Sequence, residues 1–202
     1  PQGLRSVNEK IWALNFNSLI PKTIICSKPD VLENEFNPFE SIILKPTHLF
    51  GGQGIVKTSL TDKKFESQFK TLSHHYKRAI VVQAFVKEAV KGDKRILLWK
   101  GKVIGCVLRV NEGDDFRHNF FAGGKAVDCT ISLRDKEIIN ALSPHLIKLG
   151  LDFVGIDILG DYLTEVNVTS PTCLVEMNHF AKTNLESMIF DDIEKQLAIK
   201  TS

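Results

Sequence analysis

Three oxygen-bearing side chains near the end of the chain have the types and spacing of a metal site. Asp157 lies in one apolar run, and Glu165 and Asn167 lie two residues apart in the next. Because side chains alternate along a strand, Glu165 and Asn167 share a face, and a three-residue turn would place Asp157 opposite Glu165. Carboxylate and amide oxygens suit Mg²⁺. The pattern predicts an Mg²⁺ site, although ordinary polar residues on the wet face of a hairpin would look the same.

A second group of residues could bind phosphate. Residues 50–54 read Phe-Gly-Gly-Gln-Gly and closely follow Lys45, which ends an apolar run. Backbone amides can approach phosphate oxygens where side chains are absent, and lysine binds phosphate as a point charge. No Gly-Lys-Ser/Thr of the Walker type follows. Taken alone, the glycine segment is better explained as a hairpin turn. Lys45 alone is better explained as a strand-end lysine that reaches solvent. Lys10 alone gives even weaker evidence for a phosphate site.

Arginines in the second half could bind anionic groups. Arg95, Arg109 and Arg117 lie in and beside an expected hairpin, and arginine binds carboxylate and phosphate through two parallel hydrogen bonds. Arg109 is flanked by apolar residues, so its charge needs a partner. Asp93 or Asp157 could be that partner, which would give Arg109 a structural role.

An apolar strand in the middle of the chain could bind a nucleotide base. Residues 81–86 read Val-Val-Gln-Ala-Phe-Val. Such a strand end can offer backbone N–H and C=O groups to an adenine edge, between aliphatic walls. An ordinary strand between two subdomains would have the same composition, and both interpretations stay open at this point.

The composition excludes several classes of protein. The 202 residues are 43% apolar and 25% charged, which is typical of a soluble globular protein. A net charge of +2 is too small to indicate nucleic acid, and no apolar stretch approaches the roughly 20 residues of a membrane span. The four cysteines form no CxxC pair, which argues against structural zinc and suits reduced thiols. We therefore expect a cytoplasmic protein that binds neither nucleic acid nor membrane.

Hydrophobic periodicity predicts an α+β protein. The expected helices are 6–16, which Ser6 would cap with Glu9 three residues on, and 63–75, 132–149 and 183–199. The expected strands are 23–26, 41–45, 55–58, 79–86, 95–99, 103–110, 153–159 and 162–168. We expect residues 1–85 to form a small subdomain with a lid-like glycine loop, and residues 86–202 a larger one, with a ligand cleft between them.

The order of these motifs resembles ATP-grasp ligases, and most of all the prokaryotic glutathione synthetase family. The blocks that carry the resemblance run from Gly3 to the last helix: Asn8-Glu9-Lys10, Ile42–Pro46 with Gly51-Gly52, Gly92-Asp93-Lys94-Arg95, Arg109, Arg117-x-Asn119 with Gly123-Gly124, Asp157, and Glu165-Val166-Asn167 followed by Thr169-Ser170-Pro171-Thr172. The resemblance implies an ATP-grasp fold, in which two α+β subdomains hold the nucleotide in the cleft between them.

The resemblance also implies a role for each site residue. Residues that would bind the nucleotide are the phosphate lysines Lys10 and Lys45, the lid glycines Gly51, Gly52 and Gly54, and the adenine hinge Gln83, Ala84, Phe85 and Val86. Asn119, Gly123 and Gly124 would belong to a loop, residues 111–124, that closes over the acceptor. Asp157, Glu165 and Asn167 would bind two Mg²⁺ ions, with Mn²⁺ possible, and Arg95, Arg109 and Arg117 would bind substrate, phosphate or intermediate.

The implied reaction is the ATP-dependent synthesis of glutathione. ATP would phosphorylate the cysteinyl carboxylate of γ-glutamylcysteine, and the amine of glycine would attack the acyl phosphate. The family has a preceding domain and forms oligomers, so the linker-like Pro1-Gln2-Gly3 is expected to be a cut edge. Two alternatives stay open: a ligase with another acid and amine, and an inactive fragment that binds nucleotide. The Thr-Ser-Pro-Thr run at 169–172 favours glutathione synthesis over the other ligase.

Overall fold

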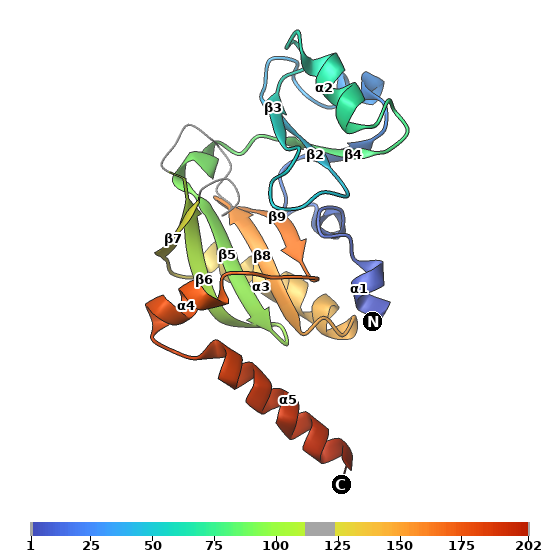
Figure 1. Ribbon diagram of the computed structural model, residues 1–202. Coiled ribbons are helices and arrows are strands. Elements are labelled where there is room, and N and C mark those ends of the chain that lie inside the picture. Colours follow the sequence, from blue (N-terminus) through green and yellow to red (C-terminus); the bar gives the residue numbers. More distant parts are fainter. Residues whose placement is uncertain (1, 112–123, 202) are drawn as a thin grey trace.

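A computed structural model describes residues 2–111 and 124–201, which form two lobes (Figure 1). The small lobe contains an antiparallel sheet of four strands in the order β1-β4-β2-β3. Its strands are β1 (Thr23–Cys26), β2 (Ile42–Pro46), β3 (Val56–Thr58) and β4 (Ile80–Ala84). Helix α2 (Phe65–Leu72) packs its buried Phe65 and Phe69 against the sheet. The short 3-10 helix η2 (Pro29–Leu32) adds Leu32 to the same core.

The large lobe is built on a five-stranded antiparallel sheet in the order β7-β6-β5-β8-β9. Its strands are β5 (Asp93–Trp99), β6 (Lys102–Val110), β7 (Lys125–Asp128), β8 (Phe153–Leu159) and β9 (Tyr162–Asn167). Alternation divides their side chains between two cores: Ile96 and Leu98 of β5 lie in one, and Leu97 in the other. The sheet therefore has a buried face on each side.

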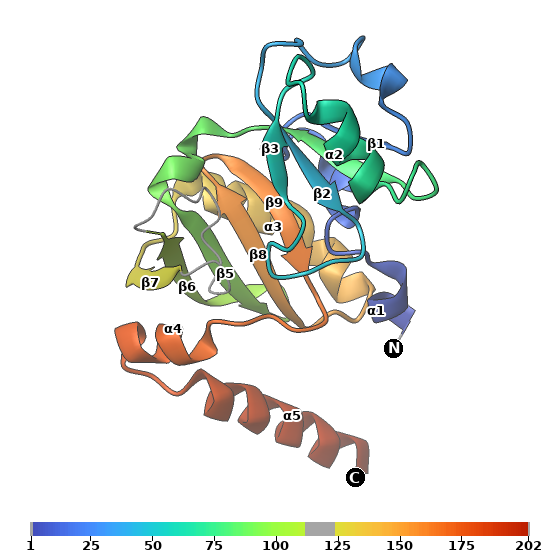
Figure 2. The same ribbon diagram turned by 45° about the horizontal axis from the view of Figure 1, so that its top comes forward.

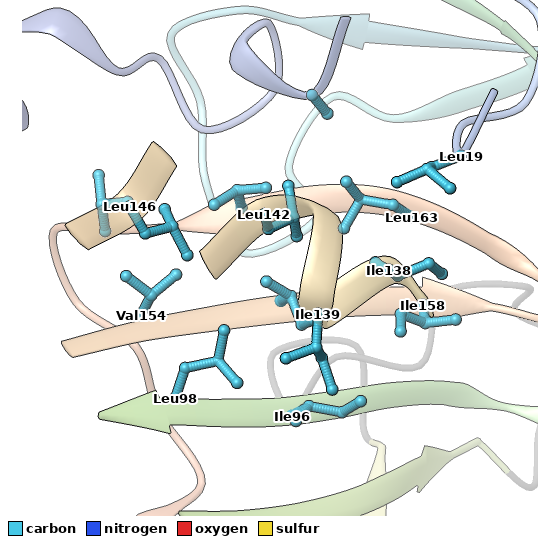
Figure 3. Packing of buried hydrophobic residues seen from close by; sticks show 14 of the residues in the cluster. Leu19, Ile96, Leu98, Ile138, Ile139, Leu142, Leu146, Val154, Ile158 and Leu163 are labelled. Carbon is cyan, nitrogen blue, oxygen red and sulfur yellow. The ribbon is translucent and has the colours of Figure 1, made fainter. Parts of the chain in front are cut away.

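Helix α3 (Leu133–Lys148) covers one face of the large sheet. Its Ile138, Leu142 and Leu146 pack against residues of β5, β8 and β9 (Figure 3). Each fully buried side chain of this size contributes about 1.5–3 kcal/mol to folding. A capping box begins the helix, because the Ser132 and Asp135 side chains each accept a hydrogen bond from the other residue's amide. Helix α4 (Leu174–Ala181) packs Met177 on the opposite face, and α5 (Leu185–Thr201) extends from it (Figure 1).

The prediction of one helix over residues 6–16 is wrong. The chain instead forms helix α1 (Gln2–Ser6) and, after a turn, the 3-10 helix η1 (Trp12–Phe16). The Asn8 side chain interrupts the helix, because its Oδ1 accepts from the amides of Lys10 and Ile11. Ser6 therefore ends α1 and caps nothing downstream.

The N-terminal segment packs on the large lobe, although it precedes the small lobe in sequence. Val7, Ala13 and Leu19 share a core with α3 and the five-stranded sheet. The amide of Leu163 in β9 donates to the Leu19 carbonyl at 2.8 Å. We therefore propose that residues 2–20 belong to the large subdomain, and that a junction near Phe85 separates the lobes further along the chain.

Other parts of the chain also differ from the expectation. Helix α2 ends at Leu72 and does not reach residue 75, because His74, His75 and Tyr76 have positive φ angles of 47°, 57° and 67°. Strand β7, helix α4 and the 3-10 helix η3 (Lys87–Lys91) were not expected from periodicity. No described helix combines the length and the apolar character needed to cross a bilayer.

Candidate functional site

A cavity of about 970 Å³ lies between the two lobes. Figure 2 shows the loop between β2 and β3 reaching from the small lobe toward β8 and β9. Most site residues expected from the sequence line the cavity: Lys10, Lys45, Gly51, Gly52, Gln83, Ala84, Phe85, Val86, Arg95, Arg109, Asp157, Glu165 and Asn167. Gly54 and Gly124 are described but do not line it. Arg117, Asn119 and Gly123 lie outside the described residues.

The expected pairing of Asp157 with Glu165 is confirmed. The two residues are directly opposite in the β8–β9 register, and Asn167 lies opposite Gly155. The turn has two residues rather than three, and a β-bulge at Thr164 supplies the missing one. The Thr164 hydroxyl fixes the bulge by donating to the Asp157 carbonyl at 3.1 Å. The bulge thus brings both carboxylates to the face of the sheet that lines the cavity.

Two arginines hold the Asp157 carboxylate. Arg95 of β5 donates to both of its oxygens, with an Nη2–Oδ2 distance of 2.9 Å. Arg109 of β6 contacts Oδ2 at 3.0 Å and also donates to Asp93. Both partners that the sequence offered for Arg109 are therefore realised. Burial alone would raise the pKa of Asp157, but the two guanidinium charges hold it well below its usual range.

Two polar atoms of this charge cluster could still form hydrogen bonds with a ligand. Within the described residues, Arg109 Nε and Asp93 Oδ1 are buried and have no hydrogen-bond partner. Both residues line the cavity. A buried polar atom without a partner costs about 1–3 kcal/mol, so a ligand that supplied the missing bonds would gain affinity.

Asp93 makes stability depend on pH. Burial raises its pKa to about 6, although the charge of Arg109 opposes the shift. A carboxyl group whose pKa is higher in the folded state stabilises the fold while it is protonated. This contribution is lost as pH rises from about 4 to about 6, by at most about 1.4 kcal/mol per pH unit. We expect the unfolding free energy of the native chain, measured against that of Asp93→Asn, to fall across this range in urea titrations. A difference that rises with pH would contradict the assignment.

Both lysines expected to contact phosphate are held inside the cavity. Lys45 Nζ donates to Gln83 Oε1 at 2.7 Å, and Gln83 Nε2 donates to Thr23 at 2.8 Å. Burial lowers the pKa of Lys45, and the Glu165 charge opposes that shift. The Lys45 ammonium group therefore bonds within the cavity lining, while the residue stays partly exposed. Lys10 Nζ donates to the Leu49 carbonyl at 2.6 Å and lies 3.0 Å from Glu165 Oε1.

The glycine loop has the backbone that its sequence requires. Gly51, Gly52 and Gly54 have φ angles of 60°, 74° and 68°, which other residues rarely adopt. A side chain at Gly54 would also lie 2.9 Å from the ring of Pro46. The loop bends sharply over the cavity, where the Lys10–Leu49 bond ties it to the N-terminal segment.

The end of β4 forms one wall of the cavity. The amides of Ala84 and Phe85 already donate to the carbonyls of Lys22 and Ser41, at 2.8 and 3.0 Å. The Phe85 ring carries Lys57 Nζ 3.6 Å from its centroid. A base bound here would need other donors, and Val86, which also lines the cavity, is the next amide along the chain.

Sequence reasoning missed Glu9, because it was taken for part of a capping box. Its Oε1 instead accepts from the amides of Val168 and Thr169 and from the Thr169 hydroxyl, at 2.8–3.0 Å. The Glu9 carbonyl also accepts from the Val166 amide at 3.0 Å. Glu9 thus fastens the segment carrying Lys10 to the end of β9. The sequence feature that could have indicated this role is the position of Glu9 next to Lys10 in the Asn-Glu-Lys block.

We expect Glu9→Ala to lower the free energy of unfolding by about 1–3 kcal/mol, because three hydrogen bonds to one carboxylate are lost. Urea unfolding followed by tryptophan fluorescence would measure the change. Glu33→Ala is the matched control, because Glu33 is an exposed acid that ends a short helix in the small lobe. Equal effects of both substitutions would contradict the fastening role.

The cavity lining contains oxygen atoms of the kind that bind Mg²⁺. The described lining carries four cationic side chains, Lys10, Lys45, Arg95 and Arg109, and four carboxylates, Glu9, Asp93, Asp157 and Glu165. These charges balance, so the described residues alone do not neutralise an added polyphosphate. Glu165 and Asn167 line the cavity and carry oxygen atoms that can bind a metal ion, and Asn167 Nδ2 lies 3.4 Å from Asp157 Oδ2. An all-oxygen set beside an anion site fits Mg²⁺.

Comparisons with known proteins give the same family. Residues 9–182 match the family model of the prokaryotic glutathione synthetase ATP-grasp domain. Glutathione synthetases of Nostoc sp. and Pseudomonas aeruginosa are each 38% identical over 99% of this chain, which spans 62% and 63% of their lengths. The enzyme of Xylella fastidiosa is 40% identical over 96% of the chain and is spanned over 62% of its length.

Solved structures show the same fold at lower sequence identity. D-alanine–D-alanine ligase from Bacillus anthracis superposes with a TM-score of 0.68 at 14% identity, over 99% of this chain and 70% of that one. The ATP-grasp ligase PsnB, solved with a phosphomimetic variant of its minimal precursor, Mg and ADP, has a TM-score of 0.65 at 15% identity. That match covers 98% of this chain and 61% of PsnB. The fold is therefore the α+β ATP-grasp fold, and the chain belongs to the prokaryotic glutathione synthetase family through its ATP-grasp domain.

Proposed function

We propose that this chain carries the ATP-dependent ligase site of a glutathione synthetase, which joins γ-glutamylcysteine to glycine through an acyl phosphate. The observation that carries the proposal is the cavity between the lobes. Its lining combines Lys10 and Lys45 with the Arg95–Asp157–Arg109 cluster, and its positive and negative side chains are equal in number. The chain spans somewhat over three fifths of its relatives' length. Activity of this chain by itself is therefore part of the proposal.

The nucleotide would lie against the small lobe. Lys10 and Lys45 would contact its phosphates, beneath the loop that contains Gly51 and Gly52. Residues 83–86 would form the wall beside the adenine, with Val86 as the amide that pairs with the base. Lys45 supports this assignment because it is a half-buried cation whose pKa is lowered by burial, and an arriving phosphate oxygen would restore part of the solvation that it lost on folding.

Arg95 and Arg109 would bind the reacting acidic groups. A carboxylate and a phosphoryl group repel each other by about 4 kcal/mol per pair of unit charges at 4 Å and an effective dielectric constant of 20. Guanidinium groups fixed in advance reduce that repulsion without reorganising. Asp157 holds both arginines in place, and the free Nε of Arg109 offers a further donor.

Glu165, Asn167 and Asp157 would hold Mg²⁺, with two ions proposed and Mn²⁺ as a possible substitute. The metal would supply positive charge beside the phosphates. We further propose that Arg117 contacts the substrate and that residues 111–124, with Asn119, Gly123 and Gly124, close over the acceptor. The proposed setting is the cytoplasm, with small-molecule substrates, no nucleic-acid or membrane partner and a possible homo-oligomer.

ADP release from Mg·ATP by the purified chain tests the function. We expect release to require γ-glutamylcysteine and glycine together, with glutathione identified as the product by mass. Release with other acid and amine pairs only would assign a different ligase. An absence of turnover in all mixtures, with Mg·ATP still raising the melting temperature, would make the chain a nucleotide-binding piece. An absence of both would overturn the proposed site.

A further inference from the structure

Two cysteines lie close together at the edge of the large sheet. The β6–β7 register ends with the pair Val107 and Asp128, and Cys106 and Cys129 are the next residues of the two segments. The Cys106 thiol donates to the Cys129 carbonyl at 3.1 Å. Residues directly opposite in an antiparallel pair have Cα atoms about 4.5–5.5 Å apart, which lies within the range that a disulfide spans.

The ionisation of one thiol is linked to that of the other. A hydrogen bond with Cys129 lowers the pKa of Cys106, and burial acts against this effect. The same hydrogen bond raises the pKa of Cys129 above its usual range. The positive charge of Lys94 lowers the pKa of both, whereas Asp128 raises it. Cys106 is therefore the thiol that ionises first, and its sulfur lies 3.1 Å from the backbone carbonyl oxygen of Cys129.

The pair is separate from the cavity between the lobes. Cys106 packs against the core beneath α3, and Val107, the next residue along β6, lies in the core beneath α4. Neither cysteine lines the cavity. Both are half-buried, so their sulfurs are not sealed inside the core. No role in the proposed ligase reaction uses them.

We propose that Cys106 and Cys129 form a dithiol site that low-molecular-weight disulfides oxidise reversibly to an intramolecular disulfide. The Cys106 thiolate attacks one sulfur of the small disulfide and expels the first small thiol, which leaves a mixed disulfide on Cys106. Cys129 then loses its proton, attacks the Cys106 sulfur and expels the second small thiol. The protein loses two hydrogens, and one small disulfide becomes two thiols.

The bond would fasten β7 to β6. Within the described residues, strand β7 lies at the edge of the sheet and pairs with β6 over four residue pairs. Because the register ends one residue before the two cysteines, the bond would join backbone segments that already lie side by side. A bond at this point constrains the unfolded chain as well, so oxidation is expected to raise the melting temperature.

Incubation of the full chain with hydroxyethyl disulfide, followed by alkylation and peptide mass mapping, tests the site. We expect one peptide pair joined through Cys106 and Cys129, which dithiothreitol separates again. Cys26→Ser is the matched control, because Cys26 is a half-buried thiol in the small lobe, and this variant should form the same bond. Mixed disulfides on Cys26 with Cys106 and Cys129 both alkylated would overturn the proposal.

Single variants test the order of the two steps. Cys129→Ser should stop at a mixed disulfide on Cys106. In the native chain, alkylation with limiting reagent should modify Cys106 before Cys129, because the pKa of Cys106 is lowered and that of Cys129 raised while both thiols are present. Modification of Cys129 first would contradict the assignment of Cys106 as the attacking thiol. The readout is mass, so a failure of the proposed ligase activity would not affect it.

Discussion

Asp157→Asn is expected to lower the free energy of unfolding by about 3–5 kcal/mol, as is typical when one partner of a buried ion pair is removed. The side chain of Asp157 is 6% exposed, and those of Arg95 and Arg109 are 5% and 4% exposed. The substitution removes the negative charge beside both arginines, and among the described residues Arg95 keeps its 3.3 Å contact to Thr172 and Arg109 keeps Asp93. Denaturant titrations at pH 7 would measure the loss.

Glu165→Gln is the matched control, because it removes the carboxylate directly opposite in the register. The Glu165 side chain is 26% exposed, and its partner Lys10 keeps the Leu49 carbonyl. Its substitution should therefore cost less than about 1 kcal/mol. Both variants should weaken Mg·ATP binding if the pair holds the metal. Equal and small stability losses would show that Asp157 does not hold the arginines. Unchanged Mg·ATP affinity in both would contradict the metal assignment.

The comparison of these two carboxylates shows what the sequence could predict. Alternation together with a three-residue turn predicted Asp157 opposite Glu165, and the structure pairs them through a two-residue turn and a bulge. Alternation could not show that Asp157 is neutralised by arginines from β5 and β6 while Glu165 pairs with a lysine from the N-terminal segment. Those contacts join residues far apart in the chain, and they depend on the order of strands in the sheet.

The errors at the N-terminus have a different physical cause. Ser6 and Glu9 have the spacing of a capping box, but tertiary hydrogen bonds to Val168 and Thr169 attract Glu9 more strongly. Local patterns predicted α3 well, because its cap is satisfied by its own residues. They failed at Glu9, where a distant strand end competes for the same carboxylate. A position where local and tertiary hydrogen bonds compete for one side chain, as at Glu9, is often part of a functional site.

Lys45→Gln is expected to weaken Mg·ATP binding by about 10- to 100-fold and yet leave the unliganded fold as stable as before, or slightly more stable. The glutamine amide can still donate toward Gln83, which now accepts from Lys45 Nζ at 2.7 Å. The substitution removes a cation that burial disfavours, so the empty protein loses little. Mg·ATP loses a charge-assisted hydrogen bond, which contributes about 1.5–3 kcal/mol.

Isothermal titration with Mg·ATP and urea unfolding of the empty chain would measure the two effects separately. Lys63→Gln is the matched control, because it removes an exposed lysine in the same lobe and should change neither quantity. A parallel loss of stability and affinity in Lys45→Gln would mean that Lys45 supports the sheet through Gln83 and that affinity falls only as a consequence. Unchanged affinity would remove Lys45 from the phosphate site. If Lys45 serves the ligand, its substitution must weaken Mg·ATP binding without lowering the stability of the empty protein. The reason is that only the ligand compensates for the burial of this cation.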